Sequence, residues 1–317
     1  MSIKSAVEAF SVGDALGMVP EFMTAEEIKQ QFGLVDRLLD PRRSRWHKDL
    51  KRGQATDDTE QLFYCMAEYK EQGINRESTA RALIRWYRER EPEKQGFIGR
   101  SSKAAIQYLM AGEDIEKAGL SGTTCGGAMR VAAAALLCKD DKELAAALYS
   151  CIAPTHNTNL AMEGAFAFGY GVFKALKGGN KTEILAAALK GGKEGSSMAL
   201  TSLAGPSTAS KIEVVCNFIR KNKKPQMIIE YLYKVIGTGM ETYEVVPVVF
   251  GLFLLYFNNP WQAIKTGASI GGDTDTIAAM AGMLTTLAKG SHNIPAEIVS
   301  EVARINGLDY GAQRFSS

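Results

Sequence analysis

The stretch IGGDTDTIAAMAGML, residues 270–284, carries the most informative pattern in the chain. Two glycines precede Asp273 and Asp275, a threonine follows each aspartate, and small and apolar residues with good helix propensity come next. Asp and Thr supply oxygens that cap the free N–H groups of a helix start, so the pattern predicts a helix N-terminus. A cap needs only one acidic residue, and the helix is apolar enough to be buried. Because charge near a core must be paired or bound, the second carboxylate indicates a partner such as a hard metal ion.

A second stretch of the same kind occurs much earlier in the chain. QATDDTE, residues 54–60, places Thr56, Asp57, Asp58 and Thr59 ahead of another apolar helix. One such cluster is usually a cap, whereas two clusters favour a shared site where the two helix starts meet. Carboxylate and hydroxyl oxygens suit Mg²⁺ or Mn²⁺, while zinc and copper prefer imidazole or thiolate. Four aspartates are enough for two ions with bridging carboxylates, which together can orient a substrate and activate water.

The rest of the chain predicts an all-α fold. Nearly every segment follows a helical period, the β-branched pairs lie inside longer helical windows, and no linker of Pro, Gly or Ser divides the chain. We therefore expect a single domain over residues 1–317. Residues 33–55 lack a period and form a predicted long ordered loop, a kind of loop that is more often functional than idle. Helices are predicted at 5–19, 24–31, 56–71, 77–90, 102–110, 128–138, 142–152, 158–176, 182–189, 209–221, 226–236, 243–256, 261–269, after 273, and at 295–304.

Composition excludes several classes of protein. With 317 residues, 23% charged and 46% hydrophobic, the chain is an ordinary globular protein, and its net charge of +2 argues against an extended nucleic-acid footprint or a polybasic membrane surface. The basic residues within 42–52 are interpreted as a solvated loop. The most apolar segment, 245–257, is too short to span a bilayer and contains Pro247.

Cysteine usage predicts a reducing compartment. The five cysteines are odd in number, scattered and never in a C-x-x-C pair, which does not suit a disulfide framework or a zinc site. Glu8 and Asp14 interrupt the first apolar stretch, so no secretory leader is expected. These features predict a soluble cytoplasmic protein.

A third acidic pair lies in GDALGMVPEF, residues 13–22. Asp14 falls among small residues and could simply accept backbone or arginine hydrogen bonds, and Glu21 could be an exposed turn residue. The alternative is functional, because a glutamate just outside a helix end and near a metal centre is well suited to act as a general base.

Two further segments are candidates for substrate contacts. In TTCGGAMR, residues 123–130, hydroxyls and glycines lead directly into a helix whose free N–H groups could receive a phosphate. A glycine pair before a helix is more often only a turn, and Arg130 could bind phosphate or serve a structural ion pair. His156, in PTHNT, is either a structural residue or a hydrogen-bond donor to a substrate hydroxyl or phosphate.

These motifs, in this order from Gly13 to Pro295, resemble those of the ADP-ribosylglycohydrolase family, which includes the dinitrogenase reductase-activating glycohydrolase and crystallin J1-like proteins. The resemblance implies an all-α orthogonal bundle with a dinuclear Mg²⁺ or Mn²⁺ centre. It also implies hydrolysis of the bond between the anomeric ribose carbon of ADP-ribose and an acceptor, for example a side chain of an ADP-ribosylated protein.

The resemblance assigns roles to individual residues. It implies metal ligation by Thr56, Asp57, Asp58, Asp273, Asp275 and Thr276. Glu21 corresponds to the ribose-binding and base-like acidic position of the family, and Glu21, Asp58 and Asp273 are the implied catalytic residues. The glycine loop that contacts phosphate in the family corresponds to Cys125, Gly126, Gly127, Ala128 and Met129, and the histidine loop corresponds to His156. Nearby carboxylates would stabilise the positive charge that develops on the ribose, and metal contacts to the vicinal ribose hydroxyls would hold the ring in place.

The sequence departs from the family pattern around the leaving group. Members specific for arginine carry an aspartate near the segment that reads GFIG here, where Phe97 stands instead, so a guanidinium would lack its partner. Cys125 replaces an asparagine common among relatives, and Ser269 replaces another. O-linked ADP-ribose or a small N-riboside therefore remains an alternative substrate. A non-catalytic binding protein and a two-metal phosphoesterase are further alternatives.

Overall fold

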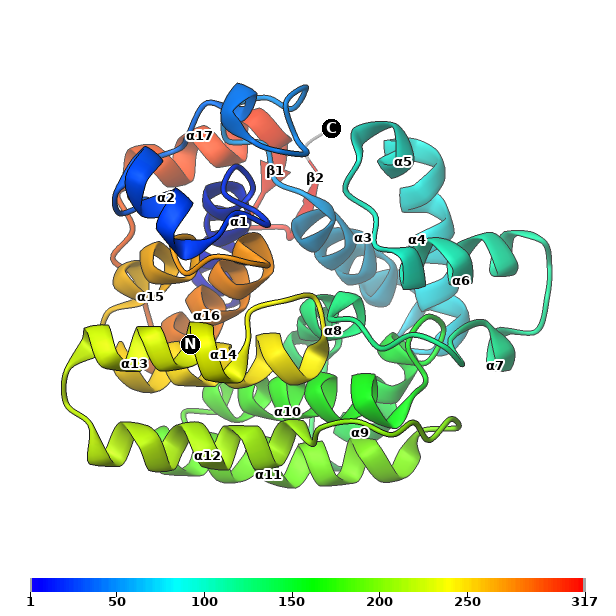
Figure 1. Cartoon of the computed structure of the whole chain (residues 1–317). Coiled ribbons are helices and arrows are strands. Elements are labelled where there is room, and N and C mark those ends of the chain that lie inside the picture. Colours follow the sequence, from blue (N-terminus) through cyan, green and yellow to red (C-terminus); the bar gives the residue numbers. More distant parts are fainter. Residues whose placement is uncertain (1, 316–317) are drawn as a thin grey trace.

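The all-α fold predicted from the sequence is confirmed in a computed structural model, which describes residues 2–315 (Figure 1). Within that range the only β-sheet is a hairpin near the C-terminus, in which β1 (Leu308–Asp309) pairs antiparallel with β2 (Arg314–Phe315). The helices are α1 (Ile3–Gly17), α2 (Ala25–Phe32), η1 (Pro41–Arg43), α3 (Asp57–Gln72), α4 (Arg76–Arg90), α5 (Pro92–Gln95), α6 (Arg100–Met110), α7 (Ile115–Ala118), α8 (Gly126–Leu137), α9 (Asp141–Ile152), α10 (Asn159–Leu176), α11 (Lys181–Met198), α12 (Thr208–Lys221), α13 (Pro225–Tyr231), η2 (Leu232–Ile236), α14 (Thr242–Leu255), α15 (Pro260–Gly267), α16 (Thr274–Lys289) and α17 (Ala296–Asn306).

The helices form two groups that cross one another. In Figure 1, α10, α11 and α12 run across the lower half, whereas α1 and α16 stand above them. One hydrophobic core, with members from Ala6 to Tyr310, joins both ends of the chain and supports the predicted single domain. Over the described residues, no helix is both long and apolar enough to cross a membrane.

One predicted helix is much too short. The predicted segment 182–189 is part of α11, which starts with a capping box between Asn180 and Glu183 and continues to Met198. Glycines in its second half suggest a break, but they allow close packing against α10. A Cβ at Gly191 would lie 2.5 Å from the ring of Tyr170, and one at Gly195 would lie 2.5 Å from the ring of Phe166. The prediction was wrong there because tertiary packing outweighs the low helix propensity of glycine.

Glycines also bring the first helix against the helix of the GGDTDT motif. A Cβ at Gly13 would lie 2.5 Å from the backbone of Ala278, and one at Gly17 would lie less than 3.0 Å from the backbone of Asp275. The hydroxyl of Thr274 donates a 2.7 Å hydrogen bond to the carbonyl of Gly17. This contact between α1 and α16 places the acidic residues of both segments side by side.

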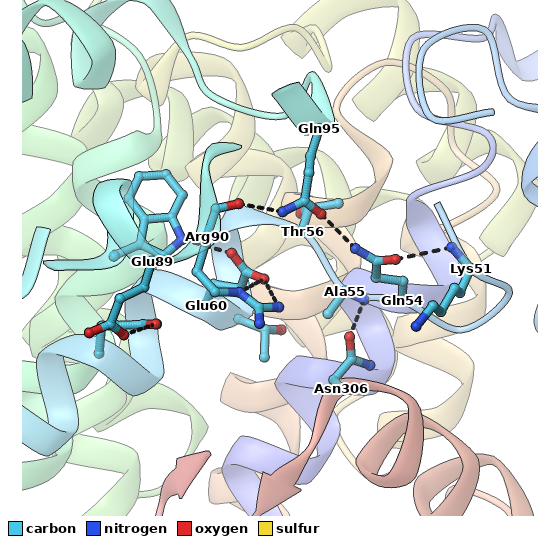
Figure 2. Close-up of polar contacts among 12 residues, drawn as sticks. Lys51, Gln54, Ala55, Thr56, Glu60, Glu89, Arg90, Gln95 and Asn306 are labelled. Carbon is cyan, nitrogen blue, oxygen red and sulfur yellow. Dashed lines mark hydrogen bonds and ion pairs between the residues drawn. The ribbon is translucent and has the colours of Figure 1, made fainter. Parts of the chain in front are cut away.

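The long loop predicted over residues 33–55 is ordered and contains only the short helix η1. Its first part is fixed by a 2.9 Å hydrogen bond from Val35 N to the Ser269 hydroxyl. Figure 2 shows how its last part is fixed: the side chain of Gln54 donates to Gln95, and Ala55 N donates to Asn306, both at 2.9 Å. These hydrogen bonds therefore fix the position at which the loop ends and α3 begins.

Candidate functional site

The two aspartate motifs meet at the first turns of α3 and α16. The Thr276 hydroxyl lies 3.3 Å from Asp58 Oδ2, and the Thr56 hydroxyl lies 3.3 Å from Asp275 Oδ2. These contacts link residues more than 200 positions apart, as expected from the shared pattern of the two stretches.

Glu21 reaches the same place from the turn that follows α1. One carboxylate oxygen from each of Glu21, Asp273 and Asp275 lies within 4.8 Å of the others, a spacing that a metal ion could bridge. Three acidic residues from two distant segments thus converge on one point.

Backbone hydrogen bonds hold the loops of the site together. Phe22 N donates to the carbonyl of Gly272 at 2.7 Å, Gly272 N donates to Met23 at 3.0 Å, and Asp273 N donates to Thr238 at 2.8 Å. Gly272 has a φ of +81°, and a Cβ there would collide with the carbonyl of Thr238. The glycine before Asp273 is therefore required both by its left-handed backbone and by the close approach of a neighbouring loop.

Asp14 caps helix α3 from a different helix. Its fully buried carboxylate accepts hydrogen bonds from the N–H groups of Thr56 and Thr59, both at 2.9 Å, and from both hydroxyls. Burial and the nearby charge of Asp275 raise its pKa to about 6. The structural interpretation of Asp14 agrees with this geometry. Because Asp14 supplies the cap, the side chains of Asp57 and Asp58 are left for the cavity.

The acidic residues form one side of a cavity of about 110 Å³, and apolar and small residues complete it. Predicted site residues on its wall are Glu21, Asp57, Asp58, Phe97, Cys125, Gly126, Met129, Asp273, Asp275 and Thr276. The wall also contains Thr124 from the glycine loop and Gly96, Ile98 and Gly99 from the GFIG segment. Phe22, Ser102 and Met240 complete it, and the sequence patterns did not single out these three as contacts.

The environment of the cavity disfavours the charged forms of its carboxylates. Burial and neighbouring carboxylates raise the pKa of Asp275 to about 8, and burial raises that of Asp273 to about 6. Burial, followed by the charge of Asp275, also raises the pKa values of Glu21, Asp57 and Asp58 well above their usual range. Asp58 Oδ1 and Asp275 Oδ1 are buried and find no hydrogen-bond partner in residues 2–315. Buried oxygens that repel one another and lack donors fit divalent cations such as Mg²⁺ or Mn²⁺.

We expect Mn²⁺ or Mg²⁺ to raise the melting temperature of the protein, and to do so more at about pH 8 than at about pH 5. The folded pKa values of Asp273 and Asp275 lie above the ordinary value of 3.8, so folding of the ion-free protein takes up protons. Their favourable contribution is present below pH 3.8 and is lost as pH rises through about 6 and about 8. A cation replaces those protons at high pH and must compete with them at low pH.

Calorimetric scans with and without chelator at the two pH values measure this effect. Ion at about a hundred times its dissociation constant adds roughly 2.7 kcal/mol, which for a chain of 317 residues corresponds to a rise in melting temperature of about 4 °C. Potassium chloride at matched ionic strength is the control. An equal shift at both pH values, or none, contradicts the expectation.

The start of the glycine loop forms another part of the cavity wall. Cys125 N donates to the carbonyl of Met240 at 2.9 Å, and the Cys125 thiol donates to Asp273 Oδ2 at 3.0 Å. Gly127 and Ala128 lie in the first turn of α8 and are buried away from the cavity wall. The prediction of substrate contact thus fits the start of the loop better than its middle.

His156 and Thr56 are buried and do not line the cavity. The fully buried ring of His156 contacts the Thr124 hydroxyl through Nε2 at 3.0 Å and the Thr155 hydroxyl through Nδ1 at 2.7 Å. Burial lowers its pKa well below the usual value, which favours a neutral ring. Thr56 is equally buried, between Asp14 and Asp275. Substrate contact by His156 and ligation by Thr56 therefore stay predictions.

Arg130 supports the glycine loop from within the protein. Its buried guanidinium donates to the carbonyl of Gly126 at 2.6 Å and to the side chain of Gln61 at 3.2 Å. It does not line the cavity, and its hydrogen bonds within residues 2–315 go to uncharged groups, so its role is structural but does not use the ion pair offered as an alternative. Its contacts tie the loop to helix α3.

One neighbour of Glu21 was missed from the sequence. His47, in the long loop, is 3% exposed, and its Nε2 contacts Glu21 Oε2. The functional expectation for that loop is the only signal that could have indicated it, because no helical or strand period relates the two residues.

Comparison with known proteins agrees with this geometry. The ADP-ribosylglycohydrolase family pattern matches residues 3–315. The chain is 28% identical over 320 residues to the uncharacterized Escherichia coli protein YegU, covering 97% of this chain and 93% of that one. It is 30% identical to an uncharacterized protein of Archaeoglobus fulgidus, covering 89% and 85% of the two chains. It is 25% identical to the ADP-ribosylarginine hydrolase Tri1 of Pseudomonas putida, covering 95% and 74%.

A solved structure described as an ADP-ribosylglycohydrolase-related protein complex has the same fold. It superposes with a TM-score of 0.69 over 98% of this chain and 96% of its own, at 21% identity. The sequence match extends over nearly the whole chain, and the conclusion is that this protein belongs to the ADP-ribosylglycohydrolase family.

Proposed function

We propose that this protein is a divalent-metal-dependent hydrolase that cleaves the glycosidic bond at the anomeric ribose carbon of ADP-ribosylated substrates. The convergence of Glu21, Asp58, Asp273 and Asp275 on one cavity is the observation that carries the proposal. The scattered free cysteines are consistent with its predicted cytoplasmic location.

The side chains of the cavity would divide the work. Thr56, Asp57, Asp58, Asp273, Asp275 and Thr276 are the proposed ligands of two Mg²⁺ or Mn²⁺ ions. When bound, such ions supply positive charge that fixes the vicinal ribose hydroxyls and lowers the pKa of water. Glu21 accepts the proton of the attacking water as a general base, and the surrounding carboxylates stabilise the positive charge that develops on the ribose. We expect no covalent intermediate, because the other carboxylates are occupied as ligands.

The dimensions of the cavity suit the reacting ribose. A volume of about 110 Å³ is well below the range of roughly 300 Å³ and above that holds a whole drug-sized ligand. The remainder of ADP-ribose would therefore extend out of the cavity past Gly126, at the start of α8. There the free N–H groups at the start of α8 and its dipole favour a phosphate. The small cavity equally favours the second candidate, hydrolysis of a small nucleoside or other N-riboside.

Phe97 argues against a guanidinium leaving group. Its side chain lines the cavity beside Ile98 and is 6% exposed, where an aspartate would be needed to pair with arginine. We expect Phe97→Asp to raise kcat/KM for ADP-ribosyl-arginine relative to ADP-ribosyl-serine by about tenfold. Phe97→Asn, similar in size but uncharged, is the matched control. A ratio that stays constant in Phe97→Asp would contradict this assignment of the leaving-group wall.

A product screen tests the proposed function. The protein would be incubated with Mg²⁺ or Mn²⁺ and with ADP-ribosyl-arginine, ADP-ribosyl-serine, poly-ADP-ribose and simple ribosides, and the products separated by chromatography. Release of ADP-ribose supports the proposal. Turnover of ribosides without calorimetric binding of ADP-ribose favours the second candidate, release of AMP indicates a phosphoesterase, and no turnover of any substrate indicates a binding protein.

A further inference from the structure

We infer that His47 is a positioning residue, which holds the carboxylate of Glu21 in place through the hydrogen bond between His47 Nε2 and Glu21 Oε2. Both side chains are largely shielded from water, with exposures of 2% for His47 and 13% for Glu21. The kinetic consequence of this contact rests on the proposed function, but the contact itself does not.

The loop is built to turn His47 inward. The Ser44 hydroxyl accepts hydrogen bonds from Trp46 N at 3.2 Å and His47 N at 3.1 Å, which makes a tight turn. Trp46 points outward and is 63% exposed, while the next residue is buried. The turn therefore determines which of two adjacent rings meets Glu21.

A second tie aligns the loop with the turn that carries Glu21. Arg45 donates a 3.0 Å hydrogen bond to the carbonyl of Phe22, the residue after Glu21, and forms an ion pair with Glu27. Phe22 has a φ of +57°, a left-handed conformation that is strained for a non-glycine residue and persists only when neighbours fix it. Hydrogen bonds from this one loop thus hold both His47 and the turn that carries Glu21.

The pattern of hydrogen bonds indicates where the proton of the ring lies. Nε2 faces Glu21, whereas Nδ1 is buried and has no partner within the described part of the chain. Buried N–H groups without an acceptor are rarer than buried acceptors without a donor. The proton is therefore assigned to Nε2, which donates to Glu21.

This hydrogen bond favours a role of Glu21 as a general base over a role as a metal ligand. One oxygen of Glu21 lies within 4.8 Å of an oxygen of Asp273 and of Asp275, so a free side chain could turn toward a cation as an additional ligand. With Oε2 held by His47, the other oxygen of Glu21 remains to accept a proton from water. Loss of the donor should therefore lower kcat and leave KM nearly unchanged, since the substrate-binding wall is not altered.

Steady-state kinetics of matched variants test this role. We expect His47→Phe, which keeps a ring but has no donor, to lower kcat by about 30- to 100-fold with KM within about twofold. His47→Gln, whose amide can donate from nearly the position of Nε2, should recover most of the activity. In a Glu21→Gln background, His47→Phe should have little further effect, because both changes act on one step.

The chain contains its own control. The ring of His292 contacts Glu8 through Nε2 at 2.9 Å, and neither residue lines the cavity. His292→Phe should leave kcat unchanged. Additive losses of kcat in the double variant, or a loss in His47→Gln as large as in His47→Phe, would overturn the positioning role.

A spectroscopic measurement on the full chain without substrate separates this inference from the proposed function. Proton–nitrogen NMR of the histidine rings should show the His47 proton on Nε2, and Glu21→Gln should shift that signal but not the signal of His292. A proton on Nδ1, or no response to Glu21→Gln, rejects the inference whether or not any substrate is cleaved. The expected signals without cleavage of any ADP-ribosyl substrate would retain the contact and reject the proposed function.

Discussion

The double variant Asp273→Asn with Asp275→Asn is expected to lose metal-dependent hydrolysis by at least about 10³-fold while keeping its helical fold. Asparagine has nearly the same shape as aspartate but removes two of the carboxylates that converge with Glu21. A neutral amide binds a hard divalent cation poorly, so both ion affinity and the charge that stabilises the reacting ribose are lost.

The same variant should be at least as stable as the parent when no ion is present. Burial raises the pKa of Asp275 to about 8, so the folded protein already disfavours its charge. A neutral side chain avoids that cost, and the ion-free melting temperature near pH 8 should stay constant or rise. An inactive variant that keeps its stability distinguishes loss of the site from loss of the fold.

Three measurements check this result: kcat/KM with Mn²⁺, calorimetric binding of Mn²⁺, and thermal unfolding followed by circular dichroism. The matched control is Asp36→Asn with Asp49→Asn, which neutralises two exposed aspartates. Undiminished turnover in the Asp273 and Asp275 double variant would reject the proposed metal centre.

The two acidic motifs could be predicted from the sequence because their information is local. Each places aspartates and threonines directly before an apolar helix, so the helix starts near Asp57 and Thr274 follow from capping and propensity. The inference that the two starts meet depended on chemistry, since so many oxygen ligands exceed what two caps need. The contact between Thr276 and Asp58 bears out that inference.

The sequence did not reveal which side chain of a motif faces the cavity. Within the glycine loop, Cys125 and Gly126 line the cavity, whereas Gly127 in the first turn of α8 packs against Ile152 and His156. Likewise, the free N–H groups at the start of α3 are capped by the side chain of Asp14 and not by that of Thr56, although both residues lie in acidic or hydroxyl-rich segments. A motif identifies a segment of backbone, but the orientation of each side chain depends on helix crossings that have no local signature.

The contact between His47 and Glu21 could not be predicted from the sequence for a related reason. The two residues come from loops without a period, and a backbone turn around the Ser44 hydroxyl brings His47 inward. Similarly, Gly191 and Gly195 resemble breakers until Tyr170 and Phe166 are seen to pack against them. In each case tertiary contacts decide the outcome, and propensity indicates only what is locally permitted.

Gly17→Ala is expected to lower the free energy of unfolding by about 3 kcal/mol or more, which for a chain of 317 residues corresponds to a fall in melting temperature of about 5 °C. A Cβ at this position would lie less than 3.0 Å from the backbone of Asp275, and backbone cannot move aside as a flexible side chain can. Helix α1 would have to shift from α16, and the hydrogen bond from the Thr274 hydroxyl to the carbonyl of Gly17 would break.

Gly17→Ala should weaken metal binding as well as stability, because the displaced backbone belongs to Asp275, a proposed metal ligand. We expect Gly17→Ala to weaken Mn²⁺ binding by at least about tenfold even where the protein remains folded, since metal sites tolerate little displacement of their ligands. Gly99→Ala is the control, as a Cβ there would meet no atom within 4 Å. Normal stability and normal Mn²⁺ affinity in Gly17→Ala would contradict the close crossing of α1 and α16. Normal affinity with reduced stability would show that the first turn of α16 is held by the loops of Gly272 and Thr238 rather than by helix α1.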